Sequence, residues 1–86
     1  MTYGIEVKQS VIKTLKRVPR EDQTKIIKAI KRLAHDPRPP HCLKLVDSPY
    51  YRIRRGDYRI IYDIQDDKLT IIILKIGHRK DVYERL

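Results

Sequence analysis

The hydrophobic positions near the start of the chain first alternate and then recur at helical spacing. In residues 3–7, apolar side chains alternate with glycine or glutamate, which is the pattern of a half-buried β-strand. From Val11 to Val18, apolar residues recur every three or four positions with basic residues between them. This spacing predicts a short amphipathic helix directly after the strand.

A second helix is predicted to follow at once, because Pro19 ends the first helix and is tolerated in the first turn of the next. Glu21 and Asp22 then fall in that turn, where carboxylates complement the helix dipole. The hydrophobic stripe of this helix contains Ile26, Ile27, Ile30, Leu33 and Ala34. Three prolines within residues 37–40 forbid further helix and favour an extended connector. We therefore expect an αα-hairpin.

From residue 43 onward the spacing of apolar residues changes to two, which is the period of a β-strand. Residues 50–55 and 58–65 both alternate, and they are joined by Gly56-Asp57. Glycine at the first position of a two-residue connection favours a tight β-hairpin. Residues 43–46 fit a further short strand before this hairpin.

The last predicted strand, residues 69–76, is strongly apolar and rich in β-branched residues, which places it centrally in the sheet. Asp66-Asp67 marks the turn before it. Gly77 is predicted to end the strand, and residues 78–86 are predicted to form a polar tail. The whole pattern predicts an α+β fold of order β-α-α-β-β-β, a small twisted, mostly antiparallel sheet with an αα-hairpin packed on one face.

Length and charge restrict the possible classes of protein. A chain of 86 residues has room for one core, so residues 1–86 are expected to form a single domain. The formal net charge is +9, and the basic residues divide evenly, ten in residues 1–43 and ten in residues 44–86. This charge attracts nucleic acid, an anionic surface or an acidic protein. The absence of an apolar signal segment and of a long apolar run predicts a cytoplasmic protein without a membrane partner.

Four arginines lie within eight residues of the predicted hairpin, namely Arg52, Arg54, Arg55 and Arg59. Strand alternation puts Arg52 and Arg54 on one face, and it puts Arg59 on the face opposite to Tyr58 and Ile60. Such a row suits a polyanion, because the planar donor fork of arginine matches phosphate and keeps its charge. The alternatives are a solvated sheet face or a ladder of salt bridges.

The sequence predicts no cofactor and no metal ion. Cys42 is the single cysteine and lacks the partners of a zinc motif. The three histidines have no spacing typical of metal ligands, and the acidic residues form no cluster on one face. Glycine-rich phosphate loops and the nucleophile elbow of hydrolases are also missing from the sequence.

Two longer strings make the chain resemble a known group. The resemblance rests on the order of the elements, on the segment LKLVDSPYYRIRRGDYRIIYDI and on the ending LKIGHRKDVY. Together they resemble the RelE/ParE superfamily of toxins from bacterial toxin–antitoxin modules, over nearly the full length. The resemblance implies the RelE/ParE-like fold and neutralisation by a cognate, usually acidic antitoxin. It also implies that operator DNA is contacted only through the antitoxin.

The resemblance implies two alternative activities. RelE-type members are metal-independent, ribosome-dependent endoribonucleases that cut mRNA in the ribosomal A site, where they contact mRNA and ribosomal RNA. The 2′-hydroxyl attacks the adjacent phosphodiester. ParE-type members share the fold but inhibit DNA gyrase and lack the nuclease residues. We take the RelE-type activity as the leading prediction, and a nucleic-acid-binding module without catalysis remains a third possibility.

The resemblance also assigns site residues. Position by position, it implies catalytic roles for Arg59, Arg79 and Tyr83 and RNA contacts for Lys44, Arg52, Arg54 and Arg55. Arg59 and Arg79 are expected to clamp phosphate, although either side chain would also suit a surface ion pair. Tyr83 is expected to stack on a base or donate to the leaving group, and the alternative is a ring that caps the core.

The general base is the least defined part of this prediction. RelE members often have lysines at the positions of Arg52 and Arg54, and a lysine can release its proton whereas an arginine cannot. The pair is therefore expected to stabilise charge and bind RNA. His78 lies inside the ending motif, and imidazole titrates near neutrality, so His78 is the candidate catalytic base. The alternative is a surface histidine at a strand end.

Overall fold

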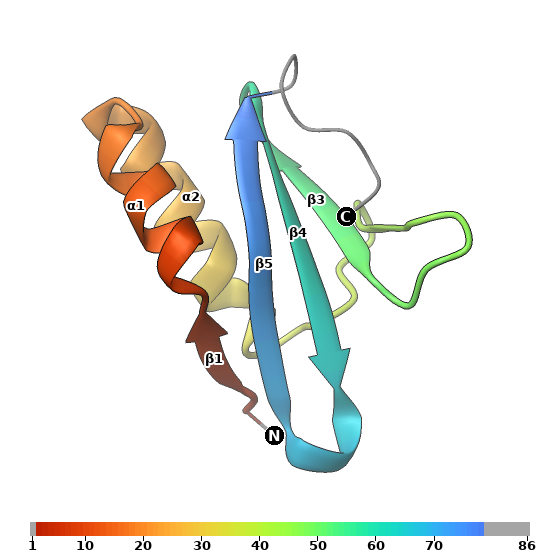
Figure 1. Cartoon of the computed structure of the whole chain (residues 1–86). Coiled ribbons are helices and arrows are strands. Elements are labelled where there is room, and N and C mark those ends of the chain that lie inside the picture. Colours follow the sequence, from red (N-terminus) through yellow and green to blue (C-terminus); the bar gives the residue numbers. More distant parts are fainter. Residues whose placement is uncertain (1, 79–86) are drawn as a thin grey trace.

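A computed structural model describes residues 2–78, and within them two helices pack on one face of a five-stranded sheet (Figure 1). The elements in chain order are β1 (Gly4–Val7), α1 (Gln9–Arg17), α2 (Arg20–Leu33), β2 (Leu43–Lys44), β3 (Tyr51–Arg55), β4 (Tyr58–Gln65), a 3-10 turn (Asp66–Lys68) and β5 (Thr70–His78). In this part of the chain, neither helix has the length and apolar character that crossing a membrane requires.

The strands lie in the order β1-β5-β4-β3-β2. β1 runs parallel to β5, whereas the pairs β5–β4, β4–β3 and β3–β2 are antiparallel. The predicted α+β class, with a mostly antiparallel sheet and an αα-hairpin on one face, is confirmed. The order contains one strand more than β-α-α-β-β-β, because residues 43 and 44 form the two-residue strand β2.

Gly77 does not end β5, contrary to the prediction. The strand continues to His78, because Gly77 pairs with Arg59 and His78 pairs with Tyr58 on β4. An existing antiparallel partner therefore outweighs the weak intrinsic strand preference of glycine. His78, which was predicted to belong to the tail, is therefore the last residue of β5, and residues 79–86 lie outside the described part of the chain.

The β3–β4 hairpin forms as predicted, and Gly56 supplies the required backbone conformation. Its φ is +58°, in the left-handed region that glycine adopts readily. A β-carbon built at this position would meet no other atom within 4 Å. Backbone conformation, rather than lack of space, therefore selects glycine in this turn.

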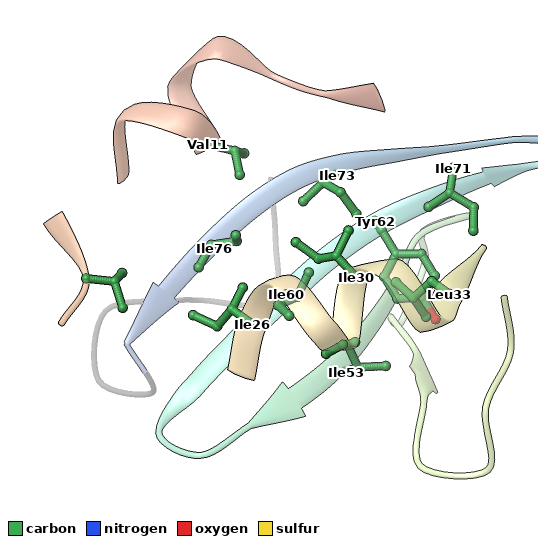
Figure 2. Packing of buried hydrophobic residues seen from close by; sticks show 12 residues of the cluster. Val11, Ile26, Ile30, Leu33, Ile53, Ile60, Tyr62, Ile71, Ile73 and Ile76 are labelled. Atoms are coloured by element: carbon green, nitrogen blue, oxygen red, sulfur yellow. The ribbon is translucent and has the colours of Figure 1, made fainter. Parts of the chain in front are cut away.

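The main core lies between the two helices and the inner face of the sheet (Figure 2). Its most buried side chains are Val11 from α1, Ile26 and Leu33 from α2, and Ile53, Ile60, Tyr62, Ile71 and Ile73 from the sheet. Ile27 was predicted to belong to the α2 stripe, but it is 37% exposed. One residue turns a helix by about 100°, so Ile27 points away from the line formed by Ile26 and Ile30.

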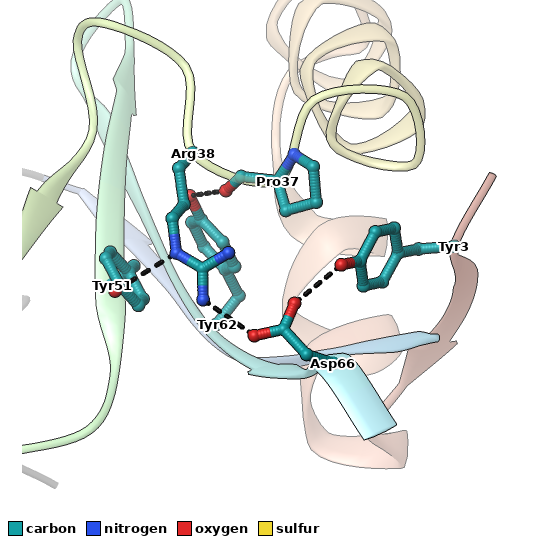
Figure 3. A network of polar contacts seen from close by, with 6 residues as sticks. All are labelled: Tyr3, Pro37, Arg38, Tyr51, Tyr62 and Asp66. Atoms are coloured by element: carbon teal, nitrogen blue, oxygen red, sulfur yellow. Dashed lines mark hydrogen bonds and ion pairs between the residues drawn. The ribbon is translucent and has the colours of Figure 1, made fainter. Parts of the chain in front are cut away.

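A polar network ties the proline connector to the start of the chain and to the β4–β5 turn (Figure 3). Arg38 Nη2 lies 2.9 Å from Asp66 Oδ2, and the Tyr3 hydroxyl donates to Asp66 Oδ1 at 2.5 Å. Arg38 Nε donates to the Tyr51 hydroxyl at 3.2 Å, and its guanidinium lies 5.4 Å from the centre of that ring. These bonds from Arg38 and Tyr3 hold the pKa of Asp66 below its usual value.

Tyr62 anchors the same connector from inside the core. Its ring is fully buried and stacks on the ring of Tyr51, with 6.0 Å between the ring centres. Its hydroxyl donates to the carbonyl of Pro37 at 2.7 Å (Figure 3). Burial is the largest cause that raises the pKa of Tyr62, so the hydroxyl stays protonated and able to donate.

Candidate functional site

The face of the sheet that points away from the helices carries Arg52, Arg54 and Arg59, and we name it the arginine face. Arg54 and Arg59 are direct partners across the β3–β4 ladder, and Arg52 lies two residues before Arg54. The alternate residues Ile53 and Ile60 pack in the main core, on the opposite face. The alternation predicted for the arginines is therefore confirmed.

The three guanidinium groups of the arginine face repel one another. Like charges directly opposite each other on a β-ladder destabilise it, which applies to Arg54 and Arg59. Arg52 is only 8% exposed, and burial lowers its pKa, with further lowering by the charges of Arg54 and Arg59. Three positive charges gathered on one face of the sheet attract anions, so the arrangement suits an anionic ligand.

A small second hydrophobic cluster supports the arginine face. Leu45 and Ile61 are buried there, and Tyr50 and Leu74 pack against them. Ile61 is the direct partner of Arg52 across the β3–β4 ladder, so this cluster lies beside the cations. The apolar cluster lowers the local dielectric beside the cations, which strengthens electrostatic interactions there.

Two hollows meet the arginine face at the end of β3. The larger, of about 590 Å³, is lined by His41, Cys42, Leu43, Arg52, Arg54 and Arg55. The smaller, of about 110 Å³, lies at the hairpin turn and is lined by Arg54, Gly56, Asp57, Tyr58 and Arg59. Arg54 borders both hollows and is exposed, so its guanidinium is accessible to a ligand from either side.

Lys44 and Arg55 do not lie on the arginine face. Lys44 pairs with Tyr51 and Arg55 pairs with Tyr58, and both tyrosines pack against the main core. Partners across an antiparallel ladder share a face, so Lys44 and Arg55 project to the side of the helices. Both side chains are exposed at the edge of the sheet. Their predicted RNA contacts would therefore be made at that edge.

His78 is also separated from the arginine face. It pairs with Tyr58, and the two rings meet edge to face with 5.6 Å between their centres. Its imidazole therefore lies on the side of the helices, across the sheet from Arg59. Arg79 and Tyr83 lie outside the described residues. Of the predicted site residues, the structure brings together Arg52, Arg54 and Arg59.

Lys75 lies on the arginine face, although the sequence pattern did not assign it there. Simple alternation from Ile71 and Ile73 would send Lys75 into the core. A β-bulge changes this, because Ile61 pairs with Lys75 whereas Tyr62 pairs with Ile73. The signal in the sequence is the spacing of three, rather than two, between the buried residues Ile73 and Ile76.

Comparison with known sequences identifies relatives among toxins. The model of the family described as ParE toxin of the type II toxin–antitoxin system, parDE, matches residues 5–83. The putative toxin RelE1 of Methanocaldococcus jannaschii is 30% identical over 88 residues, and the match covers 98% of each chain. Toxin RelG of Mycobacterium tuberculosis is 46% identical over 35 residues, which are 41% of this chain and 40% of RelG.

Solved structures share the fold over most of the chain. In the archaeal RelE–RelB complex from Pyrococcus horikoshii OT3, the matching chain is 30% identical with a TM-score of 0.84, and the match covers 95% of this chain and 100% of that one. A mutant of Escherichia coli toxin RelE in the free state is 20% identical with a TM-score of 0.80, covering 93% and 86% of the two chains, and it supports the fold. The chain therefore belongs to the RelE/ParE superfamily of toxins of type II toxin–antitoxin systems.

Proposed function

We propose that this toxin is a ribosome-dependent endoribonuclease that cleaves mRNA. The observation that carries the proposal is the group of guanidiniums on one sheet face, with Arg54 and Arg59 as direct partners across the hairpin. This gathered positive charge attracts an anion such as RNA phosphate, and the donor fork of arginine matches the geometry of phosphate. The relatives named RelE support this activity over an unspecified toxin function.

In the proposed reaction, one bond to phosphorus forms and another breaks. The 2′-hydroxyl oxygen attacks the adjacent phosphorus while the bond to the 5′-oxygen of the next nucleotide breaks. The products are a 2′,3′-cyclic phosphate and a 5′-hydroxyl, and the proton lost by the 2′-hydroxyl is balanced by one gained by the leaving oxygen. Negative charge grows on the equatorial oxygens, where the donor forks of Arg54 and Arg59 would stabilise it.

The remaining predicted residues would complete this site. Arg79 would act as a second phosphate clamp, and Tyr83 would stack on the base or donate to the leaving oxygen. We assign no proton transfer to His78, because its ring packs beside Tyr58 on the opposite side of the sheet from Arg59. The arginines supply charge stabilisation rather than proton acceptance.

Primer extension on a defined mRNA with programmed ribosomes tests this proposal. Wild-type toxin should cut at the A-site codon, and it should leave the mRNA intact when ribosomes are omitted. Arg59→Ala should cleave about 100- to 1000-fold more slowly, as expected for the loss of a preorganised donor. Arg17→Ala removes an exposed arginine at the end of α1 and should cleave like wild type. Intact mRNA from a toxin that still arrests growth would refute the nuclease proposal.

The second candidate function is inhibition of DNA gyrase, and the match to the ParE family model favours it. A gyrase inhibitor acts by binding a protein and needs no phosphate clamp. A supercoiling assay with purified gyrase separates the two candidates. If Arg59→Ala still arrests growth and the gyrase reaction fails in its presence, gyrase inhibition replaces the nuclease as the function.

The proposed natural partner is a cognate antitoxin, and operator DNA would be contacted only through it. Solved relatives are toxins in complexes with RelB, which supports a partner of this kind. An acidic antitoxin segment would place carboxylates on the arginine face, where they would occupy the position of RNA phosphates. Neutralisation would then result from direct competition for Arg52, Arg54 and Arg59.

A further inference from the structure

The β-bulge in β5 gives the arginine face a fourth cation. Ile61 has two residues opposite it, Leu74 and Lys75, because the register shifts between Ile61 and Tyr62. Leu74 packs against the small cluster of the arginine face, whereas Ile73 and Ile76 are buried in the main core. Both bulge side chains therefore point to the arginine face, as expected where two residues oppose one.

The position of Lys75 relative to the arginines follows from the ladder. Arg59 pairs with Gly77, and Lys75 lies two residues before Gly77 on the same strand. Such diagonal neighbours lie about 7–8 Å apart, within the reach of long side chains. Arg52 holds the equivalent diagonal position on the other side of Arg59. Arg59 is thus flanked by the other three cations of this face, Arg54, Arg52 and Lys75.

Lys75 is also built into this face rather than free in solvent. Its side chain is partly buried, and its direct partner is the fully buried Ile61. A lysine in this setting lays its aliphatic stem along apolar surface and carries its ammonium group outward. The ammonium is therefore directed to the surface that the arginines share.

The cations form two rows across the strands. One row contains Arg54 and Arg59, and the other contains Arg52 and Lys75 on either side of Ile61. Rows on one face are separated by two residues along a strand, which is about 6.7 Å. This separation is comparable with that of successive phosphates in a single RNA strand. Two rows therefore suit two neighbouring phosphates.

We propose that Lys75, together with Arg52, holds the phosphate next to the one clamped by Arg54 and Arg59. This inference rests on the proposed RNA-cleaving function and adds a second phosphate subsite to it. Lys75 acts in binding and positioning, by a charge contact to the RNA backbone. An arginine at position 75 would keep this contact, whereas a neutral side chain would remove it.

Salt-dependent binding of a short single-stranded RNA tests the subsite. The probe is a fluorescent RNA with 2′-O-methyl groups throughout, which blocks the attacking hydroxyl and keeps the RNA intact. Each phosphate contact adds about 0.7 to the slope of log affinity against log salt for a single strand. Lys75→Gln should lower the slope by at most about 0.7, because Arg52 still contacts that phosphate, and Lys75→Arg should restore the wild-type slope. Lys13→Gln, at an exposed position of α1, should leave it unchanged.

The variants distinguish failure of the subsite from failure of the proposed function. If Arg59→Gln lowers the slope and Lys75→Gln does not, the second subsite is wrong while the RNA-binding face stands. If neither variant lowers the slope, the subsite is wrong, whereas the proposed nuclease function is judged by primer extension with programmed ribosomes. A loss with Lys13→Gln equal to that with Lys75→Gln would also overturn the subsite, because binding would then depend on net charge alone.

Discussion

Arg54 and Arg59 lie directly opposite each other on β3 and β4, with both side chains on the arginine face. A cross-strand pair of like charges lowers the stability of a hairpin, and the same ladder would be more stable with a neutral partner. In the proposed function, an anion bound between the two groups would interact favourably with both of them.

Neutralising Arg54 should therefore stabilise the free toxin while weakening its activity. Arg54→Gln is expected to raise the free energy of unfolding by about 0.2–1 kcal/mol, and Arg54→Lys should leave it unchanged. Urea denaturation at low salt measures both variants. Sulfate should stabilise wild type more than Arg54→Gln, because sulfate occupies the anion position. A variant less stable than wild type would show that the two guanidiniums do not repel each other in the folded protein.

The helices and the hairpin could be predicted from sequence because each carries a local signal. Helical spacing of isoleucines defines α2, and Gly56 at the turn defines the β3–β4 hairpin. The face of Arg52 and Arg54 followed from strict alternation within one strand. These features depend only on neighbouring residues, so they needed no knowledge of the tertiary partners.

The features that the sequence did not reveal depend on pairing between strands. Gly77 continues β5 because Arg59 is available opposite it, and His78 lies beside Tyr58 because the register places it there. The bulge that brings Lys75 to the arginine face also arises between two strands. Alternation read on a single strand misses such a shift, since one extra residue moves every later side chain to the opposite face.

The Arg38–Asp66 ion pair should make stability depend on pH at the acid end. Bonds from Arg38 and then Tyr3 lower the pKa of Asp66 from its ordinary value of 3.8. Because the pKa of Asp66 is lower in the folded state, the ionised carboxylate stabilises the fold at any pH above its unfolded-state pKa. This stabilisation is lost as the pH falls through the folded-state pKa. Asp66→Asn should therefore be less stable than wild type at neutral pH, and the difference should shrink below about pH 4. Thermal melting temperatures measured between about pH 2.5 and 7 test this, and a constant difference over the whole range would contradict it.

The hydroxyl of Tyr62 should matter more for stability than that of Tyr51. Tyr62→Phe leaves the Pro37 carbonyl without its donor next to a fully buried ring, which is expected to cost about 1–3 kcal/mol. The Tyr51 hydroxyl accepts its bond from the exposed Arg38, so Tyr51→Phe should cost less than about 1 kcal/mol. Urea denaturation measures both. Equal effects would mean that the connector is held chiefly by Arg38 rather than by the buried hydroxyl.

Association with the antitoxin should depend on salt more strongly than dissociation does. Net charge of +9 and the cations of the arginine face attract an acidic segment over long distances, and salt screens that attraction. The association rate constant is expected to fall at least about 10-fold between low and high salt, while the dissociation rate changes less because the finished complex also buries apolar contacts.

Stopped-flow mixing with the purified antitoxin measures the association rate, and dilution or competition measures the dissociation rate. Arg54→Gln should slow association at low salt more than Arg17→Gln, which removes a charge of the same kind from the end of α1. Association rates that do not change with salt would show that the arginine face does not steer the encounter.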